Sequence, residues 1–332
     1  MRASNNIRDY KRFEKLTSDL ASNLDVCLKN NVVLTEVGSN LYLYNPIIPL
    51  ICGAEYVYAF VKDTYYGKAN EIKNSCLEIA EFLGFSDKLE IGLNELNESW
   101  INKADIVTNS GMLRPFNRSR LSKFKKGAVL PLMFEAWELR DRDIDLVACK
   151  EFGISVAGTW ENHPLLKVFD FVEMLALKMV FEAGFEVQGN NIYIWSNDHF
   201  GDKIYSAFMR NGCNKCYLGI DFKELLNLVV DLDFIFIADY DESKSFFELL
   251  QIDLLIKINP RLTFLHLYGD VDFNKFETVG ASVYPRKNGK HEMMTFTLAH
   301  VGMAPYVALQ VGGYKVAQNL INNVDSDIVQ KI

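Results

Sequence analysis

In the stretch IYIWSNDHFGDK, residues 192–203, an apolar strand pattern runs directly into the start of a helix. In an open α/β sheet this is where the pyrophosphate of a dinucleotide lies, held by N–H groups at the helix N-terminus. Against the pattern G-x-G-x-x-G, Ser196 and Asp198 replace the first two glycines, and Gly201 keeps the third. An aspartate in this turn repels a pyrophosphate unless it is neutralised. NAD binding is therefore an open question at this point.

A second acid follows the next strand. Asp221 stands about twenty residues beyond Gly201, where a carboxylate that binds the ribose of NAD belongs and where it would disfavour the 2′-phosphate of NADP. A helix N-cap before Phe222 explains Asp221 equally well. His199 is a candidate contact for an anion. The cofactor-binding candidates are Ser196, Asn197, Asp198, His199, Phe200, Gly201 and Asp221.

Strands and amphipathic helices alternate on both sides of this turn. A first series occupies residues 30–157, a second begins at 192, and a long apolar helix at 165–183 connects them. Strands separated by helices pair in parallel. The sequence therefore predicts an α/β protein with two Rossmann-like, doubly wound parallel-sheet domains, one flavodoxin-like and one dinucleotide-binding.

The domain boundaries follow from the same alternation. We expect residues 1–160 plus 303–332 to form the flavodoxin-like substrate and catalytic domain, and residues 161–302 to form the Rossmann nucleotide-binding domain. The chain has 332 residues, which suits two domains of roughly 150 residues each. The final helix is expected to return to the first domain. Gly312 and Gly313 within it indicate a close helix contact.

Composition excludes several classes of partner. Apolar residues make up 49% of the chain and charged residues 23%, the balance of a compact globular protein. The net charge of −8, without a dense basic stripe, argues against nucleic acid or an anionic membrane as a partner. Residues 1–14 carry charges where a signal peptide needs an apolar stretch, and no run approaches a membrane span. We expect a cytoplasmic protein that binds a small-molecule substrate.

The six cysteines are scattered, and most lie inside apolar runs, so we interpret them as reduced packing residues. Cys213 and Cys216 form a CxxC pair. A zinc site would need two further ligands at suitable spacing, and none follows. We therefore expect no metal.

From about residue 100 to its end, the chain resembles the D-2-hydroxyacid dehydrogenase family, which includes formate, glycerate and phosphoglycerate dehydrogenases. DIVTNSG at 105–111 resembles the family's strand and substrate loop, and RDIDL at 142–146 with GISV at 153–156 resembles its NIDL…GI.V passage. LAHVG at 298–302, followed by a helix, resembles the segment whose histidine is the general acid/base. The resemblance implies NAD as cofactor.

The chain also departs from the family at the catalytic positions. The arginine that grips the substrate carboxylate should lie within 265–269, and no arginine is there. The acidic partner of the histidine should lie within 281–285, which contains Ser282, Val283 and Tyr284 instead. Loss of the arginine changes the substrate or the chemistry.

Two histidines are the catalytic candidates. His300 would exchange a proton with a hydroxyl or carbonyl of the substrate, although a structural role beside the last helix is nearly as well supported. His266 ends a strand at the ligand-binding edge of its sheet, where a satisfied structural histidine is the alternative.

Acidic residues mark the first domain. Glu135, Trp137 and Glu138 follow one strand. Glu161 stands at the start of the connecting helix, where it could orient a histidine. Acids here suit an amine-bearing or uncharged substrate better than a keto acid, while capping and packing explain Glu161 equally well. The substrate-binding candidates are Ser110, Gly111, Glu135, Trp137 and Glu161.

Two functions remain in competition at this point. The first is a diverged NAD-dependent oxidoreductase acting on a small hydroxy, keto or amino metabolite in the cleft between the domains. The second is a non-redox nucleotide- or metabolite-binding protein that keeps the architecture and has a biosynthetic or partner-binding role. A purely structural scaffold is a weaker third alternative. A homodimer is possible in each case.

Overall fold

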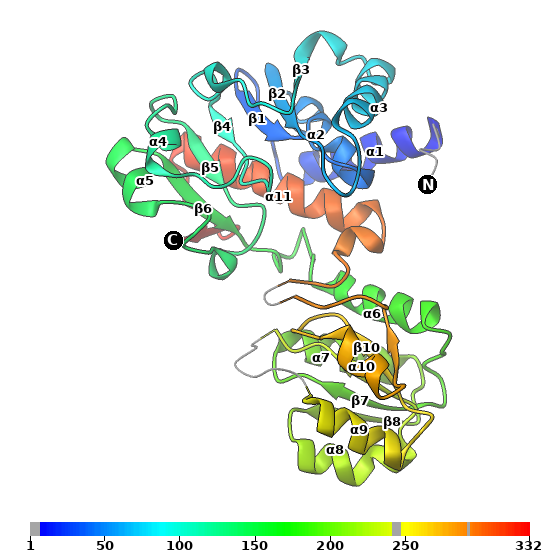
Figure 1. Cartoon of the computed structure of the whole chain (residues 1–332). Helices are drawn as coiled ribbons and strands as arrows, with labels where there is room; N and C mark the ends of the chain where they lie inside the picture. Colours follow the sequence, from blue (N-terminus) through cyan, green and yellow to red (C-terminus); the bar gives the residue numbers. More distant parts are fainter. Residues whose placement is uncertain (1–6, 241–246, 291–292) are drawn as a thin grey trace. The chain divides into compact units, whose positions relative to one another are not determined.

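The computed structural model describes residues 7–240, 247–290 and 293–332. The chain forms two compact units (Figure 1). Unit 1 comprises Met1–Val168 and Met303–Ile332, and unit 2 comprises Phe169–Gly302. Unit 2 is thus one continuous segment inserted between the two parts of unit 1.

Unit 1 is built on a seven-stranded sheet in the order β12-β6-β5-β4-β1-β2-β3. Its strands pair in parallel, except that β12 runs antiparallel to β6 at the edge. The strands are β1 (Val32–Glu36), β2 (Tyr56–Val61), β3 (Leu89–Leu93), β4 (Ile106–Val107), β5 (Val129–Pro131), β6 (Ser155–Thr159) and β12 (Val329–Lys331). An antiparallel edge strand is common on an otherwise parallel sheet.

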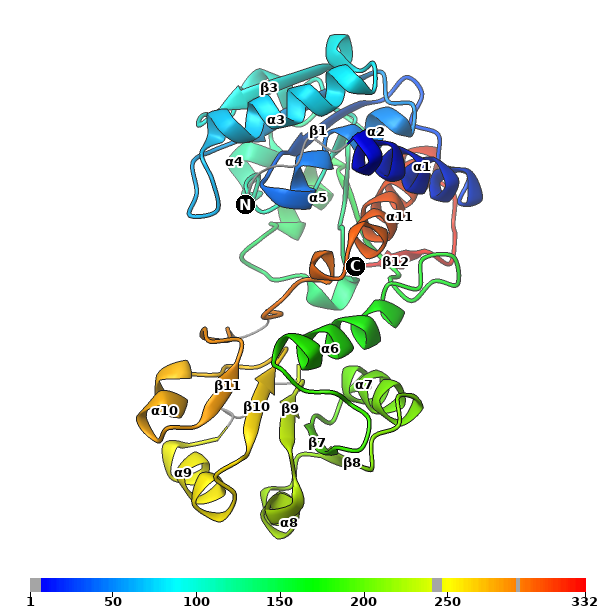
Figure 2. The same ribbon diagram turned by 90° about the vertical axis from the view of Figure 1, so that its right-hand side faces the viewer.

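The helices of unit 1 are α1 (Ile7–Asn23), α2 (Ile47–Ile51), α3 (Ala69–Phe82), α4 (Arg118–Leu121), α5 (Leu146–Phe152) and α11 (Met303–Asn322). Helix α11 lies beside α1 and packs on β5 and β6 (Figure 2). The paired glycines of α11 allow this close approach. A Cβ at Gly312 would lie 2.6 Å from Leu166 Cδ1, and one at Gly313 would lie 2.0 Å from Met133 Sδ.

Unit 2 contains a five-stranded parallel sheet in the order β11-β10-β9-β7-β8. The strands are β7 (Asn191–Trp195), β8 (Lys215–Gly219), β9 (Phe234–Ile237), β10 (Thr263–His266) and β11 (Ser282–Tyr284). The helices are α6 (Asp170–Glu182), α7 (His199–Arg210), α8 (Phe222–Leu228), α9 (Leu249–Ile258) and α10 (Phe273–Thr278).

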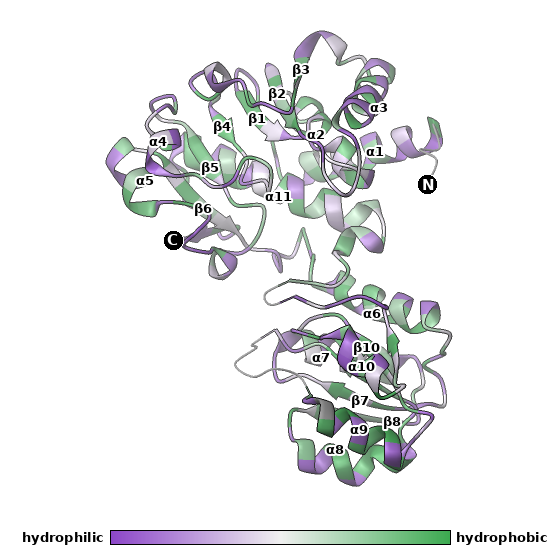
Figure 3. Ribbon diagram, viewed as in Figure 1, coloured by the Kyte–Doolittle hydropathy of each residue, from purple (hydrophilic) through white to green (hydrophobic). Residues whose placement is uncertain are grey.

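The central strands of this second sheet are buried on both faces, and β7 shows hydrophobic residues in Figure 3. Ile192 and Ile194 pack in one core with residues of α6 and α7. Tyr193, which points to the opposite face, packs in a second core with residues of α8, α9 and α10. The predicted α/β fold with two doubly wound sheets is confirmed.

Two local predictions were wrong or incomplete. The connecting helix begins at Asp170 and not at Leu165. Between His163 and Val168 the chain makes turns, and Lys167 has a φ of +49°, outside the helical region. The sequence also predicts a helix from Phe246 to Leu250; Phe246 lies outside the described residues, and α9 extends to Ile258. Within the described residues, no helix is both long enough and apolar enough to cross a membrane.

Candidate functional site

The strand order of each sheet locates its ligand-binding edge. In a doubly wound sheet, ligands bind outside the carboxyl ends of the strands, at the point where the chain reverses its direction of strand addition. In unit 2 this switch point lies between β7 and β9, and in unit 1 it lies between β1 and β4.

The turn after β7 in unit 2 is capped by its own aspartate. Asp198 Oδ1 accepts hydrogen bonds from the N–H groups of Phe200 (2.8 Å) and Gly201 (3.3 Å) at the start of α7. Its Oδ2 accepts a third, from the N–H of Tyr240 after β9 (2.6 Å). One carboxylate thus binds the helix N-terminus and also joins the two loops of the switch point.

A second carboxylate, which follows β9, bonds the turn after β7. Asp239, 6% exposed, accepts a hydrogen bond from the Asn197 N–H (3.4 Å). Ser196 is fully buried, and a Cβ at Gly201 would lie 2.6 Å from Ser196 Cβ. The one remaining glycine of the fingerprint is therefore required for close packing of strand and helix.

The other cofactor candidates lie at the same edge of unit 2. The His199 ring packs on Phe169 and Phe200, with ring centroids 5.0 Å and 4.1 Å apart. Asp221 is exposed and caps α8 by accepting a hydrogen bond from the Lys223 N–H (2.8 Å). The N-cap interpretation of Asp221 thus describes its contact in this structure.

These residues do not fit the pyrophosphate of a dinucleotide in the manner of a G-x-G-x-x-G turn. That manner requires helix N–H groups that point at the ligand. Here Asp198 accepts from the N–H groups of Phe200 and Gly201, and Asp239 accepts from the neighbouring Asn197 N–H. These donors are occupied, so a phosphate would have to displace a carboxylate to reach them.

His266 ends β10 with both ring nitrogens bonded. Nε2 lies 3.1 Å from the Pro285 carbonyl, to which it donates, and Nδ1 lies 3.0 Å from the Thr295 hydroxyl. Because the carbonyl can only accept, the neutral tautomer carries its proton on Nε2. Burial lowers the pKa of His266 to about 4. The ring is thus held neutral and fixed.

His300, in the 3₁₀ turn Leu298–His300, is paired with an acid. Its Nε2 lies 2.9 Å and 3.1 Å from the two oxygens of Glu182, the last residue of α6. The imidazole stacks on Phe296, with centroids 4.3 Å apart. Lys178 Nζ donates to the His300 carbonyl (2.7 Å). The ring is therefore oriented by a carboxylate and an aromatic face.

Tyr284 also forms a hydrogen bond with the Glu182 carboxylate. Its hydroxyl donates to Glu182 Oε2 (2.6 Å). Partial burial would raise the pKa of Glu182, but the bonds from Tyr284 and His300 and the charges of His300 and Lys178 lower it overall. The expectation that His300 lacks an acidic partner was thus wrong. The acid comes from α6, 118 residues earlier, and Tyr284 occupies the segment where the acid was sought.

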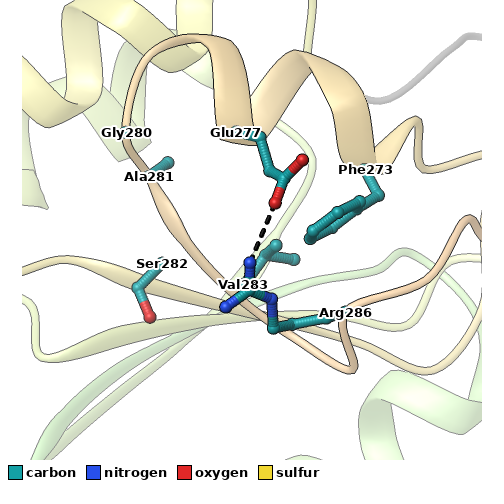
Figure 4. A pocket seen from close by; sticks show the side chains of 7 residues that line it. All are labelled: Phe273, Glu277, Gly280, Ala281, Ser282, Val283 and Arg286. Atoms are coloured by element: carbon teal, nitrogen blue, oxygen red, sulfur yellow. Dashed lines mark hydrogen bonds and ion pairs between the residues drawn. The ribbon is translucent and has the colours of Figure 1, made fainter.

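A groove also lies along β11, between this edge strand and α10 (Figure 4). It has a volume of about 480 Å³ and is lined by Phe273, Glu277, Gly280, Ala281, Ser282, Val283 and Arg286. Arg286 crosses it to bond Glu277 (2.9 Å) and lies over the Phe273 ring. The groove's two charges neutralise each other.

In unit 1, polar side chains gather at the switch point between β1 and β4. The hydroxyls of Thr35 and Thr108 form a hydrogen bond across the two strands (2.8 Å). The Thr108 hydroxyl also lies 3.2 Å from the Ser110 hydroxyl. Asn109 is 3% exposed, and neither its amide oxygen nor its amide nitrogen has a partner among the described residues. A buried amide without partners is costly.

Glu36 completes this group at the carboxyl end of β1. It accepts a hydrogen bond from the Met112 N–H (2.6 Å). Burial raises the pKa of Glu36 against the opposing effects of this bond and of the Arg114 charge. Gly111 lies in the same loop, with only Arg114 near its open side. Ser110 and Gly111 were predicted from the sequence. Asn109 lies in the same DIVTNSG segment but was not selected, and Glu36 lies in no motif.

The structure brings three predicted substrate residues of unit 1 together at the ends of β5 and β6. Glu135, 7% exposed, accepts from the Glu161 N–H through Oε1 (3.1 Å) and from the Trp137 indole through Oε2 (2.6 Å). Glu138, in the 3₁₀ turn Ala136–Glu138, accepts from the Glu135 N–H (3.3 Å). Glu138 thus joins the predicted residues in one cluster.

Burial and mutual repulsion oppose ionisation of this cluster. Burial, with the charges of Glu138 and Glu135, raises the pKa of Glu161 well above its usual value. Burial likewise raises the pKa of Glu138 to about 7, although the Arg140 charge acts in the opposite direction. Glu161 was suggested to orient a histidine, but the nearby His163 instead places its Nε2 3.4 Å from Asp327. In the described part of the chain, no three acids, histidines or cysteines are arranged to hold a metal ion.

Comparison with known proteins identifies the fold. No protein-family model and no curated protein sequence matches the chain. A dipicolinate synthase polypeptide from Bacillus halodurans is 10% identical, with a TM-score of 0.51 over 90% of this chain and 99% of that one. A dipicolinate synthase polypeptide from Bacillus subtilis is 11% identical, with a TM-score of 0.50 over 90% and 97%.

A third structure connects the fold with the family inferred from sequence. A protein from Ralstonia solanacearum, provisionally named a D-3-phosphoglycerate dehydrogenase oxidoreductase, is 11% identical, with a TM-score of 0.50 over 90% of this chain and 96% of that one. The resemblance to a diverged D-2-hydroxyacid dehydrogenase is therefore confirmed at the level of the fold.

Proposed function

We propose that this chain is a metabolite-binding protein on a dehydrogenase fold, and that it has lost the dinucleotide's phosphate site. The observation that carries this proposal is the double connection at the unit 2 switch point. Asp198 accepts the N–H groups that would hold a pyrophosphate, and Asp239 binds the same turn from β9. A small polar metabolite is instead bound at the carboxyl edge of unit 1, where Asn109 lacks any partner among the described residues.

Calorimetric titration of the full chain with NADH and NADPH tests the first half of this proposal. We expect no binding tighter than about 1 mM, because the phosphate would have to displace a carboxylate from its hydrogen bonds. Asp198→Ala should gain affinity for NADH, at a cost of about 1 kcal/mol in unit 2 stability from the lost cap. Asp221→Ala is the matched control, since it removes another N-cap of unit 2 without freeing the switch point. Micromolar binding of NADH to the unaltered chain would overturn the proposal.

A second candidate function is a diverged NAD-dependent oxidoreductase of a small hydroxy, keto or amino metabolite. It is favoured by the pairing of His300 with Glu182, because a carboxylate that accepts from one ring nitrogen orients the other for proton transfer. In this case, Asp221 would favour NAD over NADP. His300→Asn should then lower turnover by about 10²-fold or more while the fold persists.

A further inference from the structure

Three sulfur atoms lie together in unit 2 where α7 ends and β8 begins. Met209 stands in the last turn of α7, Cys213 follows the helix, and Cys216 lies in β8. Gly212, with a φ of +76°, reverses the chain in the left-handed conformation that favours glycine. The Cys213 N–H then bonds the Phe208 carbonyl (3.3 Å). The turn thus brings Cys213 back beside the last turn of the helix.

The side chains of these three residues are in contact. The Cys213 thiol donates to Met209 Sδ over 3.6 Å, and the Cys213 and Cys216 thiols are hydrogen-bonded to each other. Both cysteines are free thiols and are half-buried against the core of α6 and α7. Met209 is 49% exposed, so the group lies at the surface. Two thiols and a thioether therefore converge at a position that a helix end and a strand hold in place.

This geometry suits a metal ion bound by all three sulfurs. Two cysteines separated by two residues have a typical spacing of metal ligands. Sulfurs that share one metal ion at about 2.3 Å each lie about 4 Å apart. The 3.6 Å between Cys213 Sγ and Met209 Sδ needs only a small increase for both atoms to bind one ion. The site is thus nearly formed before an ion arrives.

The ligand types select a soft ion. Structural zinc sites have four ligands from cysteine, histidine and carboxylates. Among the described residues, no third side chain of these kinds joins Cys213 and Cys216 to hold a metal ion. The expectation of no metal was based on the ligands of zinc, which do not include a thioether. Thiolates and a thioether are the ligands that Cu(I) prefers, and two or three of them satisfy it.

We propose that Met209, Cys213 and Cys216 bind one Cu(I) ion, with the cysteines as thiolates and the methionine as a neutral third ligand. Each thiol releases its proton as its sulfur binds, so the copper stays Cu(I) and no electron is transferred. Burial raises the pKa of both thiols, so the metal-free site keeps its protons. The site lies at the amino end of β8, whereas the switch point lies at the carboxyl end of the sheet. It is therefore independent of the proposed function.

Titration of the reduced full chain with Cu(I), in anaerobic competition with the chromophoric chelator bicinchoninate, tests this proposal. We expect one Cu(I) per chain and the near-ultraviolet absorption of Cu(I)–thiolate bonds. Zn(II), used as a second probe, should bind at least about ten-fold more weakly, because it lacks two of its ligands here. No uptake of Cu(I), or equal affinity for the two ions, would overturn the proposal.

Variants locate the copper on these sulfurs. Cys213→Ser and Cys216→Ser should each lower Cu(I) affinity at least about 100-fold. Met209→Leu should lower it about ten-fold while the thiolate absorption persists. Cys27→Ser is the matched control, since Cys27 is an exposed free thiol of unit 1, and it should leave binding unchanged. Unaltered affinity in both variants of the CxxC pair, or loss of binding in Cys27→Ser, would contradict the assignment.

Alkylation of the unaltered chain keeps the proposal testable if a cysteine variant does not fold. Iodoacetamide labelling followed by mass spectrometry should find Cys213 modified in the metal-free chain and protected in the copper-loaded chain. Cys27 should be modified in both. Equal labelling of Cys213 with and without copper would refute the site. Conversion of Cys213 and Cys216 to a disulfide, with no copper retained, would show a redox pair in its place.

Discussion

The hydroxyl of Tyr284 donates to Glu182 Oε2 over 2.6 Å, at the oxygen that also lies nearest to His300 Nε2. Glu182 is the centre of this group, because Tyr284 of β11 and His300 of the 3₁₀ turn both bond its carboxylate. Its bonds lower the pKa of Glu182. The contribution of these bonds to stability is therefore present above the unfolded pKa of a glutamate and is lost as the pH falls through the folded value.

Tyr284→Phe should raise the pKa of Glu182 toward its usual value, because one donor is removed while His300 remains. The fold should be retained, since only the hydroxyl is lost. NMR titration of the Glu182 carboxyl carbon and of the His300 ring measures both groups. An unchanged Glu182 midpoint would show that Tyr284 does not act on the carboxylate.

His266 should not titrate between about pH 5 and 8, because burial lowers its pKa to about 4. Its folded pKa lies below the unfolded value, so unfolded chains bind more protons, and stability should rise with pH between about 4 and 6.5. Denaturant unfolding at several pH values, compared with His266→Phe, checks this slope. A ring resonance of His266 that titrates near pH 6.5 would contradict it.

Relative to the unaltered protein, Glu161→Gln should be more stable at about pH 8 than at about pH 4. The folded pKa of Glu161 is raised, so its contribution is most favourable below the unfolded glutamate value and declines as the pH rises toward the folded value. The glutamine amide does not ionise, so the variant lacks this dependence of stability on pH. Thermal unfolding of both proteins across this range gives the difference, and Glu55→Gln controls for the loss of charge. Destabilisation of Glu161→Gln that grows with pH would have the wrong sign.

Gly158→Ala should destabilise unit 1 by about 1–3 kcal/mol, because the added Cβ meets the backbone of Ala136 and not a movable side chain. The same collision should displace Glu135 and Glu138. Gly111→Ala is the matched control in unit 1, where the nearest atom is the end of the Arg114 side chain, 3.7 Å away. Equal unfolding midpoints for the two variants would refute the packing argument.

Local patterns in the sequence were sufficient for the fold. The passage from β7 into α7 and the start of α8 at Phe222 follow from an apolar run and from N-caps, which act over a few residues. The antiparallel β12 was missed because three residues, Val329–Lys331, give no periodic signal. Its pairing with β6 depends on the return of the chain through α11.

The candidate sites were less predictable from the sequence because their contacts are long-range. Glu135 was selected as an acid after a strand and Glu161 as one at the start of the connecting helix, but their hydrogen bond joins residues that are 26 positions apart. Glu182 had no signal, since it is one of several acids on a helix surface. Asp198 was recognised as a conflict with phosphate, whereas its bond to Tyr240 became visible only when β9 was placed beside β7.

The insertion of unit 2 within unit 1 has a consequence for the order in which the chain assembles during synthesis. Unit 2 is a continuous segment, so all of its strands are available for folding before residue 303 is made. Unit 1 must wait, because α11 packs on β5 and β6 and β12 completes the edge beside β6. A nascent chain that ends near Gly302 would therefore present a finished second sheet and a first sheet whose apolar face still lacks its long covering helix.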